Sequence, residues 1–479
     1  MAFVLRRLIA VVVAGAGIAS LLATGPPPVP VVDLEVDHEI VCVGEPVTLS
    51  WSVDTAGSTP GPRDLWFVSA PEDGFDPALE GAFLSELSSP LTVTALRSTW
   101  LGVMNWQSYV SGRALVGVSA MLCDAFGRQW DDTALNVAAI DVDPMSEELV
   151  IALDYPGEAS RLVTLDATLT PTSGMSIAGD VTALAIAPSS RERLVAGTTT
   201  TALGEATPGQ RSGFVRVIDA TGAVLWTDLF AAQATRGIAL DNNGDVVVVG
   251  TRGGYLDGFS AFVRRYDALG TLRWERVIER EDADASGRAV QVAPDGTTAV
   301  TGTFTEVNGD AIDTFLVTFD RDGGTDWDRR VAGHAASGAL VFDGARWVLA
   351  ATDVVAFEGD GSPAWTFVPP ASSLPQALAV LPDGGLAVAY ARYAQAPYGP
   401  YHYPARDHLN VGVGRLSEAG IGISDVAFGS LGDDRAHTLA VWPALGPATL
   451  VVAGSTRGHL LAEKAVGPWR DAFLIVLDD

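Results

Sequence analysis

Apolar and polar residues alternate in short runs over most of this chain, which is the pattern of half-buried β-strands. In the segment "GFVRVIDATGAVLW" (213–226), the residues of "FVRVID" alternate between two faces, a turn follows from Asp219 to Gly222, and Trp226 begins a return strand. The 51 glycines and 27 prolines are spread over the whole length, as expected for many short strands joined by tight turns. The pattern therefore predicts an all-β chain.

Three segments repeat this pattern without gaps, at 213–226, 261–274 and 314–327, and looser copies occur elsewhere. Each segment carries Phe, then Asp five residues later, then Trp seven residues beyond the Asp. A tryptophan that recurs once per unit predicts packing between neighbouring units rather than ligand stacking, because such a ring buries about 150–250 Å². The tryptophans expected to pack in this way are Trp130, Trp226, Trp274, Trp327 and Trp365.

A near-continuous run of small and apolar residues accompanies each unit and precedes its Phe–Asp–Trp segment. Such runs suit inner strands that are buried on both faces. The seven runs begin at Asn136, Thr182, Arg236, Arg288, Gly338, Gln376 and His437. Seven inner strands predict seven four-stranded blades, and hence a seven-bladed β-propeller over residues 126–479, with a solenoid as the alternative.

The two ends of the repeat region complement each other. The last copy, "DAFLIVLDD", stops at Asp479 without its return strand, and an orphan strand of the missing kind, "GRQWDD" (127–132), precedes the first inner run. Supplied from the N-terminal side, strand 127–132 would complete the seventh blade and leave the ring without an open edge. A solenoid would have no use for such a split unit.

Residues 31–125 are expected to form a smaller β-sandwich, because their apolar residues alternate in further short runs. The stretch "CVGEPVTLSW" resembles the start of immunoglobulin-like (Ig-like) domains in bacterial surface proteins, which implies a core position for Trp51. Cys42 and Cys123 form an even pair, which in an exported chain indicates a disulfide. It would close a loop of about 80 residues, contribute about 4 kcal/mol to stability, and fasten the edge of the sandwich rather than cross its middle.

The repeat units resemble those of bacterial seven-bladed β-propeller repeat proteins (the SBBP type), as in "DAFLIVLD", "SAFVRRYDALGTLRW" and "LPDGGLAVAY". The stretch "VIDATGAVLW" (217–226) is also similar to the docking motif of PQQ-like propeller repeats. The resemblance covers 127–479 and implies a fold rather than a function, since such families include quinoprotein dehydrogenases, an outer-membrane assembly scaffold and surface proteins without known activity. Quinoproteins use eight blades and commonly a pair of adjacent cysteines. Neither feature is found here, so no cofactor is expected.

Charge restricts the classes of partner. The formal net charge of −28 argues against nucleic acid, whose recognition needs a basic footprint. This acidity favours solubility in an extracellular or saline setting, with a diffuse cation-binding surface as the alternative. The 48% of hydrophobic residues suffice for a substantial core.

The N-terminus carries the pattern of an export signal. Arg6 and Arg7 precede an apolar run over 8–23, which a Gly-Pro-rich breaker at 25–28 follows. This order predicts a signal peptide over 1–25 and a Pro-rich linker over 26–30. The run is shorter than the roughly 20 residues of a spanning helix, so an uncleaved anchor is the alternative and the sole expected membrane contact. We expect an exported protein of the bacterial cell envelope: periplasmic, at the cell surface or extracellular.

The sequence shows no motif for catalysis or metal binding. The six histidines have none of the spacings of metal-ligand motifs. "DNNGD" (241–245) and "DRDGG" (320–324) resemble calcium loops, but they lack the twelve-residue ligand series and stand where hairpin turns are required. We therefore expect neither catalytic residues nor a metal site.

Long connections after the second strand, around 200–211, 252–259, 304–312, 392–408 and 456–470, mark one end of the propeller as the binding face, because function tends to lie on loops held by a rigid scaffold. The most distinctive of these loops is "RYAQAPYGPYHYPARDH" (392–408), whose composition is typical of contact surfaces, although it could instead fold over its own blade. Its candidate binding residues are Arg392, Tyr393, Tyr398, Tyr401, His402, Tyr403, Arg406 and His408. The leading hypothesis is a non-enzymatic binding or scaffold protein for a protein or glycan partner. The alternative is a propeller enzyme, a hydrolase or a cofactor-dependent one, with a site in the central funnel.

Overall fold

The computed structural model describes residues 31–37, 40–42, 46–54, 65–70, 89–94, 99–105, 115–121, 127–130, 136–155, 159–200, 211–254, 258–306, 312–332, 339–394, 408–430, 432–446, 449–458, 460–461 and 470–477. The predicted signal peptide and linker over 1–30 lie outside these residues. Cys123 also lies outside them, so the predicted disulfide stays a prediction.

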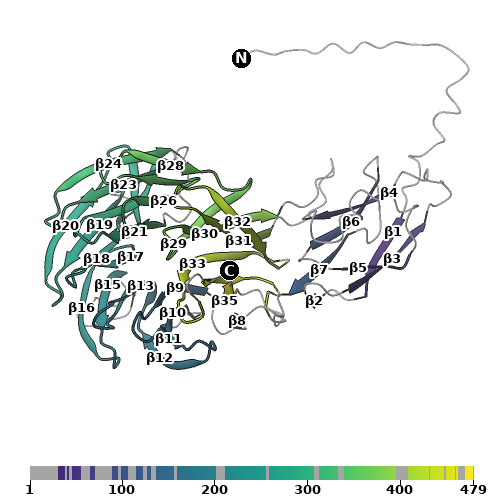
Figure 1. The fold of residues 1–479 in the computed structure, drawn as a ribbon, viewed down its shortest axis with the longest axis horizontal. Helices are drawn as coiled ribbons and strands as arrows, with labels where there is room; N and C mark the ends of the chain where they lie inside the picture. The colour runs from purple at the N-terminus through teal and green to yellow at the C-terminus, as the bar shows by residue number, and fades with distance from the viewer. Residues whose placement is uncertain are drawn as a thin grey trace, which may run out of the picture.

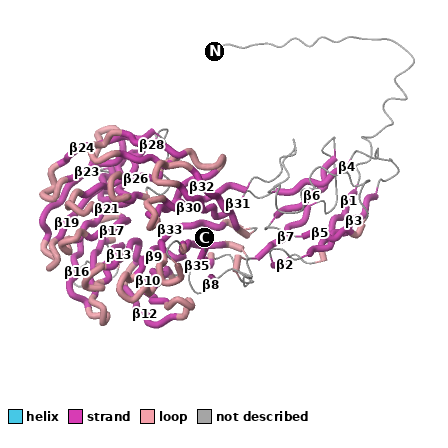
Figure 2. The backbone as a smooth tube through the Cα atoms, viewed as in Figure 1, coloured by secondary structure: helices cyan, strands magenta, loops and turns pink. Residues whose placement is uncertain are grey.

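The described residues form strands, turns and bends but no helix (Figure 2). They build eight four-stranded sheets and one three-stranded sheet. Accordingly, nothing in this part of the chain is a helix long and apolar enough to cross a membrane. The predicted all-β fold class is confirmed.

Two sheets come from the first part of the chain. The three-stranded sheet has the order β1 (Val31–Val36), β3 (Pro46–Asp54), β5 (Leu91–Thr94), and the four-stranded sheet has the order β2 (Ile40–Cys42), β7 (Leu115–Met121), β6 (Thr99–Asn105), β4 (Leu65–Ala70). β5 and β6 follow each other in the strand order along the chain, but they pair in different sheets. In β1, Val32 and Leu34 are fully buried while Asp33 and Glu35 are exposed, so this strand buries one face.

Seven four-stranded sheets follow in the described part of the chain, and in six of them the strand order across the sheet is the order along the chain. The first three are β9 (Asn136–Val142), β10 (Leu149–Asp154), β11 (Ser160–Leu165), β12 (Pro171–Ile177); β13 (Asp180–Ile186), β14 (Arg193–Thr199), β15 (Ser212–Ile218), β16 (Val224–Ala231); and β17 (Ala234–Leu240), β18 (Val246–Gly254), β19 (Gly258–Tyr266), β20 (Leu272–Ile278). The next three are β21 (Ala283–Val292), β22 (Thr298–Glu306), β23 (Ile312–Phe319), β24 (Thr325–Ala332); β25 (Leu340–Phe342), β26 (Trp347–Ala350), β27 (Val354–Phe357), β28 (Pro363–Phe367); and β29 (Ser373–Val380), β30 (Leu386–Ala394), β31 (His408–Leu416), β32 (Gly422–Phe428).

The seventh of these sheets is split between two parts of the chain. It has the order β33 (Asp434–Val441), β34 (Leu450–Thr456), β35 (Asp471–Leu477), β8 (Gly127–Trp130). The orphan segment 127–132 thus contributes β8, which pairs antiparallel with β35 from Gly127 opposite Ile475 to Trp130 opposite Ala472. Strands more than 300 residues apart in sequence share one sheet as a result.

The first strand of each sheet contacts the first strands of the neighbouring sheets. These contacts run from β9 through β13, β17, β21, β25, β29 and β33, and return from β33 to β9. Figure 1 shows these strands near the centre of the sheets, with fourth strands such as β16 and β24 at the periphery. Repeated four-stranded sheets in this arrangement are the architecture of a β-propeller repeat protein.

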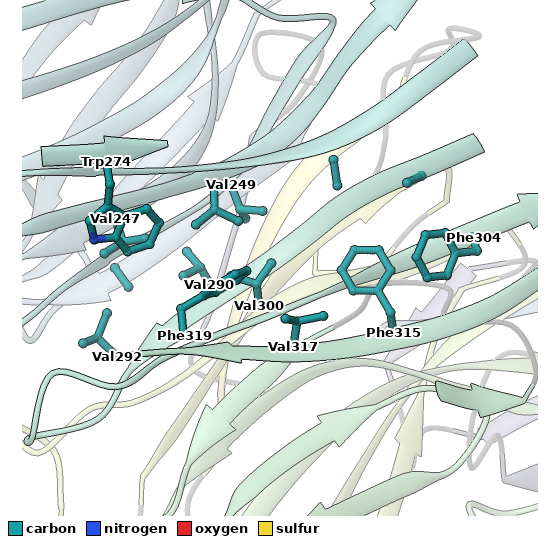
Figure 3. Packing of buried hydrophobic residues seen from close by; sticks show 14 of the residues in the cluster. Val247, Val249, Trp274, Val290, Val292, Val300, Phe304, Phe315, Val317 and Phe319 are labelled. Carbon is teal, nitrogen blue, oxygen red and sulfur yellow. The ribbon is translucent and has the colours of Figure 1, made fainter. Parts of the chain in front are cut away.

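Neighbouring sheets pack face to face through apolar side chains. Figure 3 shows one such layer, in which Val249 and Trp274 of the β17 sheet lie among Val290, Val300 and Phe315 of the β21 sheet. The second strands are the most completely buried, and each residue over 246–249 of β18 is at most 1% exposed. Because the first strands converge at the centre, many of their positions hold alanine or glycine, which explains the small-residue runs seen in the sequence.

Most of the repeating tryptophans lie against a glycine of the next sheet. A Cβ atom added to Gly270 would come within 2.6 Å of the Trp226 ring, and the indole Nε1 of Trp226 donates to the Ala268 carbonyl oxygen at 3.2 Å. The same stacking joins Trp274 to Gly323, Trp327 to Gly361 and Trp365 to Gly420. Each of these glycines has positive φ, so the turn geometry and the space for the indole both require glycine. Trp130 of β8 is partly buried against the cluster between the first and the last sheets.

Replacing Gly270 with alanine is expected to lower the free energy of unfolding by about 2–3 kcal/mol, because the new methyl group meets the Trp226 ring and φ is +85°. The matched control is Gly222→Ala, where φ is +92° but no atom lies within 4 Å of the added Cβ, so only about 1 kcal/mol is expected. Urea unfolding of the two variants measures the difference. Equal losses would show that backbone strain alone explains the glycine at position 270.

Candidate functional site at the loop end of the sheets

The long connections lie at one end of the sheets, which we call the loop end. Antiparallel pairing places the end of each second strand beside the start of the first, as where Ala234 of β17 pairs with Thr251 of β18. The tight turns, such as the one in which Gly244 donates to the Asp241 carbonyl oxygen at 3.1 Å, lie at the opposite end. Most residues of the long connections are outside the described residues.

The candidate loop at 392–408 is described only at its margins. Arg392 Nη1 donates to Asp425 Oδ2 at 3.3 Å, and Tyr393 is 46% exposed. His408 begins β31, but its side chain is not described. The other candidates, Tyr398, Tyr401, His402, Tyr403 and Arg406, lie outside the described residues. Their binding role therefore stays a prediction.

Near the loop end, six of the first strands carry a one-residue β-bulge at the same place in the repeat. In β17, for example, Thr235 and Gly237 face the consecutive residues Gly250 and Val249, which leaves Arg236 between them without a partner position. A bulge turns a side chain out of the regular alternation and often lies beside a functional site. The bulged residues, which we call the bulge ring, are Ala138, Thr182, Arg236, Arg288, Gln376 and His437.

The bulge ring is chemically distinct from the strands that carry it. Five of its six described members are polar or charged, although each precedes a run of small and apolar residues. The position that aligns with them in the fifth sheet, Gly338, lies outside the described residues. Sequence reasoning used five of these residues only to mark where runs begin, and it began the first run at Asn136, two residues before Ala138. Aligning the runs by their shared apolar positions would have shown one position that varies in polarity while the rest of the run stays apolar.

Arg236 and Arg288 occupy equivalent positions on β17 and β21, which contact each other. Burial lowers the pKa of both guanidinium groups, and the neighbouring positive charges of Arg211 on Arg236 and of Arg236 on Arg288 lower it further. Within the described residues, neither side chain has a carboxylate partner, and Nε of Arg288 is buried without a hydrogen-bond acceptor. Arg236 is exposed and Arg288 is half-buried, so the loop end holds two adjacent cations, one of which has a buried Nε.

On the opposite side of the ring, His437 lies beside further cations. Its Nε2 is 3.1 Å from Ser455 Oγ, which also accepts from Arg470 Nη1 at 3.4 Å. Burial, and then the positive charges of Arg470 and Arg435, lower the pKa of His437 to about 4, so the ring is neutral at pH 7. Ser455 is 1% exposed. A buried hydroxyl is a poor nucleophile, and the weakly basic imidazole beside it is a poor general base.

A cavity of about 480 Å³ opens at the loop end, between the β13 and β17 sheets. We call it the arginine cavity, because Arg211, Arg252 and Arg264 line it together with Glu275. Arg252 Nη1 and Arg264 Nε each donate to Glu275 at 2.6 Å, so one carboxylate orients two guanidinium groups. Gln233, Ser260 and Phe262 also line the cavity.

Second contacts fix these arginines in place. Arg264 Nη1 donates to Asp228 Oδ2 at 3.1 Å, and its guanidinium carbon lies 4.5 Å from the centre of the Phe230 ring. Arg211 Nη1 donates to the Gln233 carbonyl oxygen at 3.3 Å, in the connection just before β17. Arg211 is exposed, and the structure records no carboxylate partner for it among the described residues. Among the described residues, the cavity therefore offers one cation without a carboxylate partner, Arg211, and two that are partly compensated.

The calcium-like segments at 241–245 and 320–324 form hairpin turns. Asp320 Oδ1 accepts from the backbone nitrogens of Asp322 at 2.9 Å and Gly324 at 2.7 Å, which closes the turn. Asp241 and Asp245 bind the buried Arg265. Across the described residues, no cluster of three or more His, Cys, Asp or Glu side chains is arranged to hold a metal ion.

Buried carboxylates elsewhere also hold strands and turns together. Asp434 accepts from the Ser430 hydroxyl at 3.0 Å and from the hydroxyl of Thr456, while burial raises its pKa to about 7. Burial likewise raises the pKa of Asp141 to about 6, and this side chain accepts from the backbone nitrogen of Ile186 at 2.7 Å, across two neighbouring sheets. These carboxyl groups are occupied by local donors rather than directed at a common point.

Comparison with known proteins shows similarity in fold only. No protein-family model matches the chain, and no curated protein matches it. Among solved structures, the RRP9 WD40 repeats cover 74% of this chain and 97% of their own at 11% identity and a TM-score of 0.47. A streptogramin B lyase covers 74% and 98% at 10% identity and a TM-score of 0.43. The WD40 propeller domain of Doa1 covers 74% and 96% at 11% identity and a TM-score of 0.44. Likenesses this distant carry no argument about activity.

Proposed function

We propose that the chain is an exported, non-enzymatic binding or scaffold protein that uses the loop end of a seven-bladed propeller as its binding surface. In this proposal the seven sheets from β9 to β8 are the blades, β8 closes the ring, and the two sheets of the first 125 residues form an Ig-like spacer. The location is periplasmic, at the cell surface or extracellular. The partner is a protein or a glycan.

The observation that carries this proposal is the concentration of polar, poorly compensated side chains at the loop end. The bulge ring places arginine, glutamine and histidine at equivalent positions of otherwise apolar strands, and the arginine cavity opens at the same end of the sheets. The described ring members are half-buried or exposed, so their side chains are accessible to a ligand, which favours a binding role.

A purely catalytic role has less support from the same side chains. His437 is the one ring member with acid–base chemistry, and a pKa of about 4 makes it a weak base at neutral pH. The serine beside it is buried. The propeller enzyme remains the competing hypothesis, and a panel of hydrolase and lyase substrates tests it directly.

The predicted disulfide between Cys42 and Cys123 is part of the proposal. Parallel pairing of β2 with β7 places Cys42 beside Met121, two residues before Cys123 in the chain. Mass spectrometry of the unreduced protein after proteolysis should therefore recover one peptide pair joined by a disulfide. Recovery of both cysteines as free thiols from the oxidised, exported protein would refute the bridge.

Replacing Arg252 with glutamate is expected to abolish binding to whichever glycan or protein on an array the wild type recognises. The change reverses a charge in the arginine cavity and repels Glu275. Leu269→Glu is the matched control, because Leu269 is 86% exposed in a turn at the opposite end. If only the control variant loses binding, the binding surface lies at the end opposite the loop end, and the proposal is wrong. Turnover of a substrate by the wild type would replace the proposal with the enzyme hypothesis.

A further inference from the structure

Arg211, Arg236 and Arg288 form a continuous line of cations from the arginine cavity into the bulge ring. Arg211 donates to the backbone of Gln233, which directly precedes β17, and Arg236 is the third residue of that strand. Arg288 occupies the equivalent position on β21, whose contact with β17 brings the two bulges side by side. Three side chains from two sheets and one connection thus meet at the loop end.

This arrangement favours the binding of a negative charge. Two guanidinium groups at adjacent bulges repel each other, and Nε of Arg288 is removed from water without an acceptor. Two other arginines show the pairing that this couple does not have: Arg265 is paired with Asp241 and Asp245, and Arg264 is paired with Glu275. Arginine forks bind carboxylate, sulfate and phosphate oxygens in a bidentate manner, so an oxyanion is the ligand that fits Arg236 and Arg288.

The lining of the arginine cavity indicates what carries that oxyanion. Gln233, Ser260 and Glu275 supply hydrogen-bond acceptors and donors beside the arginine donors, and Phe262 adds an aromatic side chain to the lining. Hydroxyl groups both donate and accept, so a ligand rich in hydroxyls fits this mixture. An acidic peptide offers carboxylates but no comparable set of hydroxyl groups. The volume of about 480 Å³ is within the range of small-ligand sites and suits one or two sugar rings.

We propose that the loop end binds an acidic carbohydrate, with the carboxylate of a uronic acid residue held by Arg236 and Arg288 and the neighbouring hydroxyls held in the arginine cavity. Arg211 lies between the two parts of this site. The inference rests on the proposed binding function and names the ligand class for the same surface. A free sugar acid and a uronate chain share this chemistry, and the experiment separates them.

Isothermal titration of the full chain with a galacturonate hexamer tests the proposal. The hexamer should bind, and its fully methyl-esterified form, which lacks the charge, should bind at least tenfold more weakly. If free galacturonate binds with an affinity within tenfold of that of the hexamer, the ligand is a single sugar acid. If its affinity is weaker than that, the ligand is a uronate chain. Equal affinity for the acid and the ester overturns the proposal, as does a hexaglutamate peptide that binds when the hexamer does not.

The variant Arg236→Gln/Arg288→Gln separates binding from folding. We expect it to lose at least tenfold in affinity for the hexamer while its melting temperature stays equal or rises, because the repulsion between the two cations is removed. Arg161→Gln, an exposed change on β11, is the control and should leave binding intact. Unchanged affinity in the double variant overturns the proposal. If no acidic probe binds but Arg252→Glu still abolishes binding of another ligand on the array, the ligand class is wrong and the binding surface stands.

Discussion

Replacing Arg265 with leucine is expected to lower the free energy of unfolding by about 3–5 kcal/mol. The side chain is fully buried and binds Asp241 and Asp245, with Nε 3.1 Å from Asp245 Oδ2. Its Nη1 also donates to the Gly296 carbonyl oxygen at 3.0 Å, in the turn of the next sheet. Removing the guanidinium leaves two carboxylates, each at most 2% exposed, without their main partner. Urea unfolding measures the loss.

Two further variants show whether charge pairing is the cause. Arg273→Leu removes a guanidinium 3.4 Å from Asp245, but its side chain is 50% exposed, so a loss below about 1 kcal/mol is expected. Arg265→Leu combined with Asp241→Asn and Asp245→Asn should be more stable than Arg265→Leu alone, because no unpaired charge stays buried. If the triple variant is no more stable than the single one, lost packing rather than unpaired charge explains the effect.

The sequence was sufficient to locate most of the strands because their patterns depend on local spacing. Trp226, Asp219 and Gly222 recur at fixed distances, and the structure shows why: the aspartate accepts from the turn backbone at 2.8 Å, and the glycine at the equivalent position of the next sheet receives the indole. The first strands hold small residues because these strands converge at the centre of the sheets. Such local requirements can be recognised in one sequence.

The candidate site could not be found in the same way, because it depends on register. Arg264 meets Glu275 since the two residues are directly opposite across β19 and β20, and a shift of one residue would place them on different faces. The bulge at Arg236 adds one residue to β17, and nothing in the composition of the strand marks its position. Arg265 was equally hidden: the acidic "DNNGD" segment suggested a cation, but nothing nearby in sequence indicated that the cation is an arginine twenty residues later.

Deleting residues 127–132 is expected to destabilise the seven sheets by about 5 kcal/mol, a large part of the roughly 5–15 kcal/mol typical of a folded protein. Without β8, the backbone edge of β35 loses its ladder and Trp130 leaves the cluster between the first and last sheets. Two polar links are lost as well. Gln129 Nε2 donates to Asp471 at 2.9 Å, and Arg128 Nη1 donates to the Leu169 carbonyl oxygen of the first sheet at 3.1 Å.

Removing residues 1–125 is the matched truncation, because it takes away the two N-terminal sheets and keeps β8. If β8 closes a ring of seven blades, this shorter chain should unfold in urea within about 1 kcal/mol of the full chain, while the chain that lacks 127–132 should unfold far earlier and expose β35 to self-association. Light scattering detects that association. Should both truncations destabilise the sheets equally, the boundary at 126 is wrong and the N-terminal sheets are part of the same folding unit. Should neither do so, the pairing of β8 with β35 contributes little, and closure must come from the contact of β33 with β9 alone.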